Sequence, residues 1–193
     1  MTGPRGAAEG GEVRSTVMEL ERVDAIIDEG PGDVRNRSIE EIRSLRAEAQ
    51  TLEAGLSFVR RIVQGRLDIV GAELARRKSG GPPTDVADLV ASLPDILSDR
   101  VRAPGLGRLP QILAPADMSG LMREVDEIAH VDTLTALGGQ SDLELDQLAT
   151  DLGDYEKSVS AKRRSLHDVI DAVQAELTRR YKTGEASVES LLQ

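Results

Sequence analysis

The sequence contains no cysteine and no tryptophan, and its 193 residues include one phenylalanine and two tyrosines. The absence of cysteine excludes disulfides, thiolate metal sites and cysteine nucleophiles. Because there are only two histidines, any zinc site or catalytic triad would have to be poor in histidine. The scarcity of aromatic side chains argues against a β-sandwich, a barrel or an α/β core, which usually draw on aromatic and β-branched residues.

Long hydrophobic runs are also missing. No stretch approaches the roughly 18 apolar residues that a membrane span requires, and the N-terminal residues lack the apolar region of a secretory signal. Charged residues make up 30 % of the chain, a composition typical of long exposed helices. We therefore predict a cytoplasmic, all-α protein that does not enter a membrane.

Negative charge is concentrated in one acidic block, residues 117–156. This block contains eleven acidic residues and one basic residue, Arg123, whereas the charges of the remaining chain sum to zero. Such a block repels the backbones of DNA and RNA and favours a basic partner. A solvated face that only aids solubility is an equally open interpretation.

Apolar periodicity and turn-forming residues define the domain organisation. We predict a disordered, glycine-rich N-terminus over residues 1–11 and a single helical domain over residues 12–193. A short helix is expected over 12–29. Two long helices are expected over 38–78 and 141–182, and a capping box opens each of them.

A proline- and glycine-rich connection, residues 79–140, joins the two long helices. Six of the eight prolines of the chain lie in this connection. We expect a short helix over 85–99, bent or broken at Pro94, and another over 118–130. Residues 186–192 can form one or two further helical turns.

The two long helices are copies of each other. When the sequence is shifted by 103 residues, 14 of the 40 positions from Ser38 to Arg77 are identical, without a gap. The capping box that begins at Ser38 falls on the capping box that begins at Ser141. This agreement in phase indicates an internal duplication.

Each long helix carries an apolar stripe with three-and-four spacing, which is typical of a coiled-coil seam. The copies therefore most simply pack against each other. The stripe residues are Leu45, Leu52, Leu56, Val59, Val63, Val70 and Leu74 in the first copy, and Leu148, Leu152, Tyr155, Val159, Leu166, Val169 and Val173 in the second.

A polar ribbon flanks the apolar stripe on each copy. Its residues lie at offsets 0, 4, 7, 11 and 15, which at 100° per residue fall within about 80° of one helix face. A solvated face is the alternative interpretation, but the recurrence of the pattern in both copies argues against it. The first ribbon is Glu53, Ser57, Arg60, Gln64 and Asp68, and the second is Glu156, Ser160, Arg163, His167 and Asp171.

These residue types suit a guanine nucleotide. An arginine fork matches a phosphate or the O6/N7 edge of guanine. A carboxylate accepts the paired N1–H and N2–H₂ donors of guanine, and Ser and Gln add neutral contacts to phosphate or ribose. Two copies imply two such units or one two-fold symmetric ligand.

The pattern Glu-x₃-Ser-x₂-Arg-x₃-Gln-x₃-Asp resembles the ligand signature of the RsiG family of actinobacterial anti-sigma factors. Residues 53–68 match it in full, and residues 156–171 match except at His167. The resemblance implies two long helices in an antiparallel coiled-coil hairpin with short accessory helices and flexible linker and termini. It further implies a regulatory cyclic di-GMP dimer bound to the ten ribbon residues, no metal, and capture of a WhiG-type sporulation sigma factor.

Two other classes of function compete with this interpretation. One is a helical coiled-coil tether that binds partners but no nucleotide. The other is an enzyme acting on the nucleotide, which we do not expect, because the sequence has no glycine-rich phosphate loop after a strand, no metal cluster and no paired acid and base.

Overall fold

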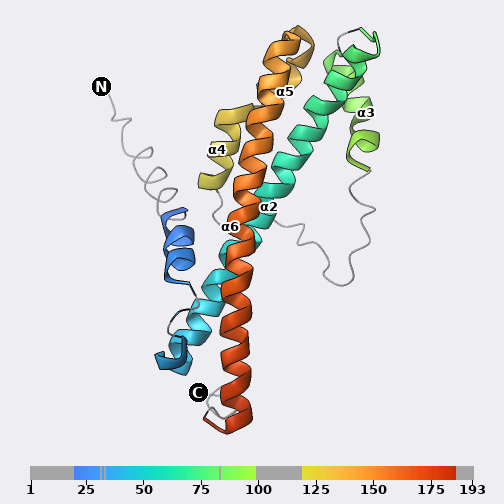
Figure 1. The fold of residues 1–193 in the computed structure, drawn as a ribbon. Coiled ribbons are helices and arrows are strands. Elements are labelled where there is room, and N and C mark those ends of the chain that lie inside the picture. Colours follow the sequence, from blue (N-terminus) through green and yellow to red (C-terminus); the bar gives the residue numbers. More distant parts are fainter. Residues whose placement is uncertain (1–19, 31, 33, 83, 99–118, 186–193) are drawn as a thin grey trace, which may run out of the picture. The chain divides into compact units, whose positions relative to one another are not determined.

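The structure, a computed structural model, describes residues 20–30, 32, 34–82, 84–98 and 119–185. Every regular element in this part of the chain is a helix, which confirms the all-α class (Figure 1). Residues 20–29 are helical. The further elements are η1 (Val34–Asn36), α2 (Ile39–Lys78), α3 (Val86–Ser98), α4 (Ser119–Ala129), α5 (Val131–Thr135), η2 (Leu137–Gly139) and α6 (Asp142–Thr183).

The chain divides into two compact units, each of which contains part of both long helices. Unit 1 comprises Met1–Ser57, Pro115–Gly120 and Ser160–Gln193, and unit 2 comprises Phe58–Ala114 and Leu121–Val159. Unit 1 thus pairs the beginning of α2 with the end of α6, and unit 2 pairs the end of α2 with the beginning of α6. The two long helices form an antiparallel hairpin, because side-chain contacts join increasing numbers on α2 to decreasing numbers on α6. These contacts are Arg43–Tyr181 and Glu53–His167 in unit 1, and Arg60–Glu156 and Arg77–Asp142 in unit 2.

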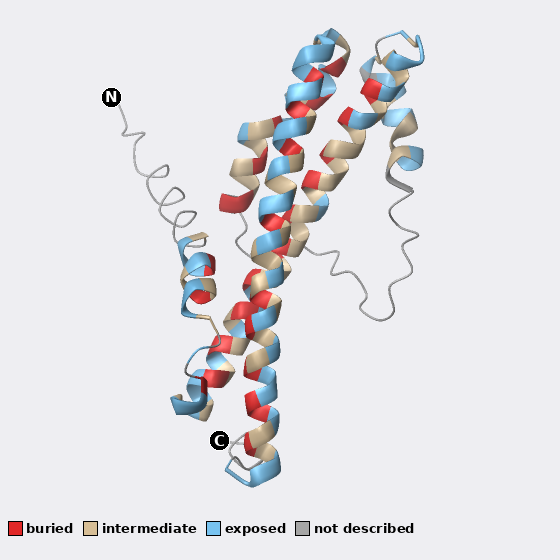
Figure 2. Cartoon of the chain, viewed as in Figure 1, coloured by how far each residue is buried: buried red, intermediate tan, exposed pale blue. Residues whose placement is uncertain are grey.

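The apolar stripes form the core of each unit (Figure 2). Every predicted stripe residue except Tyr155 is at most 8 % exposed, and full burial of such a side chain contributes about 1.5–3 kcal/mol. Tyr155 is half-buried and donates a hydrogen bond of 3.0 Å to Glu124 on α4. Burial and the neighbouring Glu124 carboxylate raise the pKa of the Tyr155 hydroxyl.

Both predicted capping boxes are present at the start of the long helices. The backbone N–H of Ser38 donates to Glu41 at 2.6 Å, and that of Glu41 donates to the Ser38 hydroxyl at 3.2 Å. Ser141 and Glu144 repeat the exchange at 2.7 Å and 3.3 Å. At the other end, Gly80 and Gly184 take φ values of 80° and 76°, the left-handed conformation that ends many helices.

An arginine clamp at the end of α2 holds the turn that leads into α6. Arg77 donates to the carbonyl oxygens of Leu137, Gly138 and Gln140 at 2.8, 3.4 and 2.7 Å. Glu73, whose side chain is 2 % exposed, accepts hydrogen bonds from Arg76, Arg77 and Thr84. Burial opposes ionisation of Glu73, but these donors outweigh it and lower its pKa to about 2.

Unit 1 contains the duplicate of this clamp. Arg180, at the end of α6, donates to the carbonyl oxygens of Val34 and Arg35 at 3.2 and 2.9 Å. Glu176 accepts hydrogen bonds from Arg179 and Arg180, which lower its pKa to about 2. In both units the end of one long helix therefore fixes the 3₁₀ turn that precedes the other.

The connection between the long helices differs from the sequence-based expectation in two respects. A bend or a break was expected at Pro94, and helix α3 continues through that residue, so the helix is not broken there. Proline removes the hydrogen bond to the Val90 carbonyl, and Val90 is 60 % exposed, so water can reach that turn. Helix α5 was not predicted, because its N-cap is His130 and not one of the residues usual at that position, Ser, Thr, Asp or Asn. The Nδ1 atom of His130 accepts a hydrogen bond from the backbone N–H of Asp132 at 3.3 Å.

Several sequence-based expectations lie outside the described residues: the disordered N-terminus over 1–11, the beginning of the first helix, and the helical turns over 186–192. Among the residues that the structure does describe, no helix combines the length and the hydropathy that a membrane span requires.

Candidate functional site

The ribbon residues of the two helices meet in unit 2 around one carboxylate. Glu156 on α6 accepts, through Oε1, a hydrogen bond of 2.8 Å from Arg60 Nε and another of 2.8 Å from Gln64 Nε2, both on α2. The side chain of Glu156 is 19 % exposed and that of Arg60 is 34 % exposed. We call Glu156, Arg60 and Gln64 half-site 2.

The same arrangement occurs in unit 1 with the helices exchanged. Glu53 on α2 lies, through Oε1, 3.5 Å from Arg163 Nη1 and 3.1 Å from His167 Nε2, both on α6. The Ser57 hydroxyl donates to the same oxygen at 2.7 Å. We call these four residues half-site 1. His167 therefore occupies the place that Gln64 has in half-site 2, and the departure from the sequence motif preserves the contact.

Of the other three ribbon residues, Asp68 in unit 2 and Ser160 in unit 1 are half-buried. Asp171 is exposed and lines an open groove on α6 together with Gln174 and Thr178. The contacts described above bring together seven of the ten predicted residues, three in unit 2 and four in unit 1.

One polar pair beside half-site 1 was missed by the sequence analysis. Arg46 Nη1 on α2 donates to Gln174 Oε1 on α6 at 2.7 Å. Arg46 lies seven residues before Glu53, which places it on the same helix face. That spacing was a detectable signal, but the corresponding residues of the other copy, Ala149 and Gly71, carry no polar side chain.

Two arginine nitrogens in unit 1 retain unused hydrogen-bonding capacity. The Nε atoms of Arg46 and Arg163 are buried and have no hydrogen-bond partner among the described residues. A buried donor without a partner costs about 1–3 kcal/mol. An acceptor that reached Arg163 Nε, such as a phosphate oxygen, would remove that cost.

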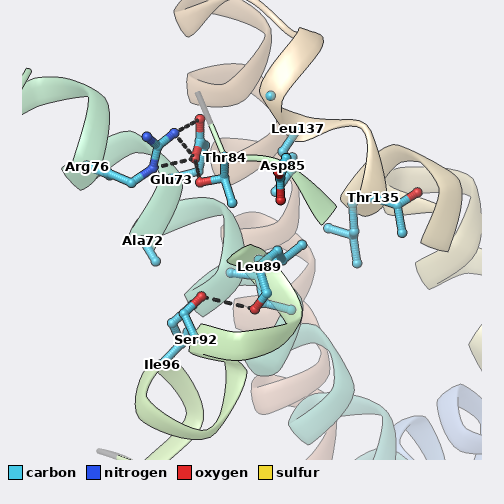
Figure 3. A pocket seen from close by; sticks show the side chains of 13 residues that line it. Ala72, Glu73, Arg76, Thr84, Asp85, Leu89, Ser92, Ile96, Thr135 and Leu137 are labelled. Atoms are coloured by element: carbon cyan, nitrogen blue, oxygen red, sulfur yellow. Dashed lines mark hydrogen bonds and ion pairs between the residues drawn. The ribbon is translucent and has the colours of Figure 1, made fainter. Parts of the chain in front are cut away.

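A cavity of about 170 Å³ in unit 2 is separate from the half-sites. It lies between α2, α3 and the α5–η2 segment, and none of the ten ribbon residues lines it (Figure 3). Its polar wall is formed by Glu73, Arg76 and Thr84, which are bonded to one another. Because these groups satisfy each other, the cavity presents mainly apolar side chains such as Leu89 and Leu137.

The donor set of the half-sites suits a nucleotide better than a metal ion. Each half-site combines one carboxylate with one guanidinium and an amide or imidazole. In the described part of the chain, no group of three or more His, Asp or Glu residues is placed to hold a metal ion.

A protein-family model described as RsiG-like matches residues 28–97 and 131–193, which is more than half of the sequence. The chain therefore belongs to the RsiG-like family. The matched ranges contain both long helices and every ribbon residue. Membership of this family indicates a regulator of the anti-sigma-factor type, with a sigma factor as partner. No curated protein matches the chain.

Proposed function

We propose that this protein is an anti-sigma factor that binds cyclic di-GMP, as a dimer, through the ribbon residues and in that state sequesters a WhiG-type sigma factor, which blocks transcription of sporulation genes. The observation that carries the proposal is the repeated half-site. In each unit a ribbon arginine and an amide or imidazole lie against the ribbon glutamate of the opposite helix.

The charges of ligand and protein support this assignment. A cyclic di-GMP dimer has four phosphate charges and four guanines, so it requires cations and paired acceptors. Arg60 and Arg163 supply a guanidinium in each unit, and guanidinium forks bind phosphate or the O6/N7 edge of guanine. Asp68 and Asp171 supply carboxylates that can accept the N1–H and N2–H₂ donors.

The acidic block supports a basic protein partner. Along α6, five of its residues are exposed: Asp142, Glu144, Asp146, Asp151 and Asp154. A sigma factor presents basic surfaces that contact DNA, and complementary charge favours association with such surfaces. We propose that this segment of α6 contributes to the sigma factor interface.

A titration with and without the sigma factor tests the proposal. Labelled cyclic di-GMP should bind to the protein, and the sigma factor should tighten that binding. Linkage then requires cyclic di-GMP to tighten sigma factor binding by the same factor. A coupling of at least about fivefold is expected, measured by fluorescence anisotropy for the ligand and by calorimetry for the partner.

The same titration separates the proposal from its rival, a helical tether that binds no nucleotide. Equal capture of the sigma factor with and without cyclic di-GMP would show that the nucleotide is not the switch. Absence of nucleotide binding, with the partner still captured, would favour the tether.

Half-site 1 predicts that its histidine can be exchanged for the residue of half-site 2. His167 Nε2 lies 3.1 Å from Glu53 Oε1 and 3.3 Å from Arg163 Nη1. Gln64 Nε2 makes the equivalent contact with Glu156 in half-site 2. We therefore expect a glutamine at position 167 to keep the contact with Glu53.

His167→Gln tests this prediction, because it reproduces the residue found in half-site 2. The variant should bind cyclic di-GMP about as well as the unmodified protein, measured by calorimetry. A marked loss of affinity would show that half-site 1 needs a contact of the imidazole that an amide cannot make.

A further inference from the structure

The ribbon glutamates are less exposed than the arginines and the histidine that they contact. The side chains of Glu53 and Glu156 are 15 % and 19 % exposed, whereas those of Arg60, Arg163 and His167 are 30–38 % exposed. Each glutamate is therefore less accessible to a ligand from solvent than the arginine that it contacts.

One carboxylate oxygen of each glutamate, Oε1, is already engaged by the protein. Glu53 Oε1 has Ser57, Arg163 and His167 within 3.5 Å, and Glu156 Oε1 accepts from both Arg60 and Gln64. A carboxylate oxygen has two lone pairs. The Oε1 atoms therefore have little capacity left for the paired donors of guanine.

Electrostatics also disfavours direct contact between these glutamates and the ligand. A carboxylate near a phosphodiester is repelled, and the repulsion grows in a partly buried environment. A carboxylate that fixes a guanidinium stabilises the ligand indirectly, because an arginine held in one orientation loses less conformational freedom on binding.

We infer that Glu53 and Glu156 are positioning residues, each of which orients the arginine and the amide or imidazole of the opposite helix toward the ligand. The inference rests on the proposed function. It also means that the unit that binds the ligand is not the motif of a single helix. Each half-site is a composite of both helices, with the glutamate from one copy of the motif and its partners from the other, although the motif is read along a single helix.

A mutant cycle on half-site 2 tests the inference, with unlabelled cyclic di-GMP as the probe in calorimetry. Glu156→Ala should weaken binding about tenfold in the unmodified protein. In the Arg60→Ala/Gln64→Ala background, where nothing remains to be positioned, the same change should cause no loss or a small gain. A loss of similar size in both backgrounds would overturn the inference and show direct contact with the ligand.

Glu156→Gln provides a second readout that does not depend on a weak-binding background. The amide oxygen of glutamine still accepts from Arg60 and Gln64, so binding should stay within about threefold of the unmodified protein. A glutamine cannot present two acceptors to guanine. An affinity as low as that of Glu156→Ala would therefore overturn the positioning role.

Glu48→Ala is the matched control. Glu48 on α2 also pairs with an arginine of another helix, Arg22, at 2.5 and 2.7 Å, but it lies outside the ribbon. Its removal should leave ligand affinity within about twofold. The failure of the inference is distinguishable from that of the proposed function, since in the latter case the unmodified protein itself would not bind cyclic di-GMP.

Discussion

Replacing Arg60 or Arg163 with alanine is expected to weaken cyclic di-GMP binding by about 1–3 kcal/mol, or roughly tenfold to more than a hundredfold. Each change removes the guanidinium of one half-site. It also leaves Glu156 or Glu53 without its arginine partner, so an uncompensated carboxylate then lies where the phosphates must approach. Both consequences reduce affinity, which is why this is the largest effect that we expect on ligand binding.

The folded structure should survive both substitutions, because neither arginine lies on the apolar stripe. Helicity measured by circular dichroism and the thermal midpoint should change little. Lys162→Ala is the matched control. It removes one positive charge beside Arg163 in the sequence, but Lys162 pairs with Asp24 of the helix at residues 20–29. If the arginine variants bind cyclic di-GMP like the unmodified protein, the ribbons are only solvated faces.

The features that sequence analysis predicted correctly are those that depend on periodicity along one helix. The capping boxes at Ser38 and Ser141 fixed the start of both long helices, and three-and-four spacing identified the buried stripe. Each of these signals is local, because a helix places residues three and four apart on one face whatever it packs against.

The pairing of the ribbons could not be predicted in the same way. That Glu156 meets Arg60 and Gln64 depends on the register between two helices about ninety residues apart in sequence. A motif read along one helix carries no information on that register. Aligning the two copies suggested equivalence of Glu53 with Glu156, but the contacts run from each glutamate to the other copy.

The arginine clamps show a second reason for incomplete prediction. The alignment identified Arg77 and Arg180 as equivalent, but their acceptors are backbone carbonyl oxygens of the turns that include η1 and η2. Every residue has a backbone carbonyl, so residue type does not show which carbonyl oxygen accepts from an arginine. The sequence therefore showed that these arginines are repeated, but only the structure shows what they bind.

The Glu73→Ala substitution is expected to destabilise the fold by about 3 kcal/mol, the value typical of removing one partner from a buried ion pair. The Glu73 side chain is 2 % exposed and holds both Arg76 and Arg77. Without Glu73, Arg76 and Arg77 lose the carboxylate that they bind beside the turn before α6. Urea unfolding of the full chain measures the change. Glu127→Ala, which removes an exposed glutamate of α4, should shift stability by no more than about 0.5 kcal/mol.

The pKa of Glu73 predicts how this contribution depends on pH. In the folded protein the pKa is lowered from its ordinary value of 4.5 to about 2, so the unfolded chain takes up the proton first as the pH falls. The stabilisation is complete above about pH 4.5, declines as the pH falls toward 2, and is lost below that.

Glu73→Gln cannot ionise and should therefore show a shallower loss of stability between about pH 5 and 2. Some slope should remain, because the pKa of Glu176 is lowered in the same direction by Arg179 and Arg180. Ligand affinity measured at pH 7.5 should stay close to that of the unmodified protein, since Glu73 belongs to neither half-site. The dependence of unfolding free energy on pH could also be equal in Glu73→Gln and in the unmodified protein. That result would mean that the pKa of Glu73 is the same in the folded and unfolded chain, and it would contradict a stabilising role of the ionised Glu73 carboxylate.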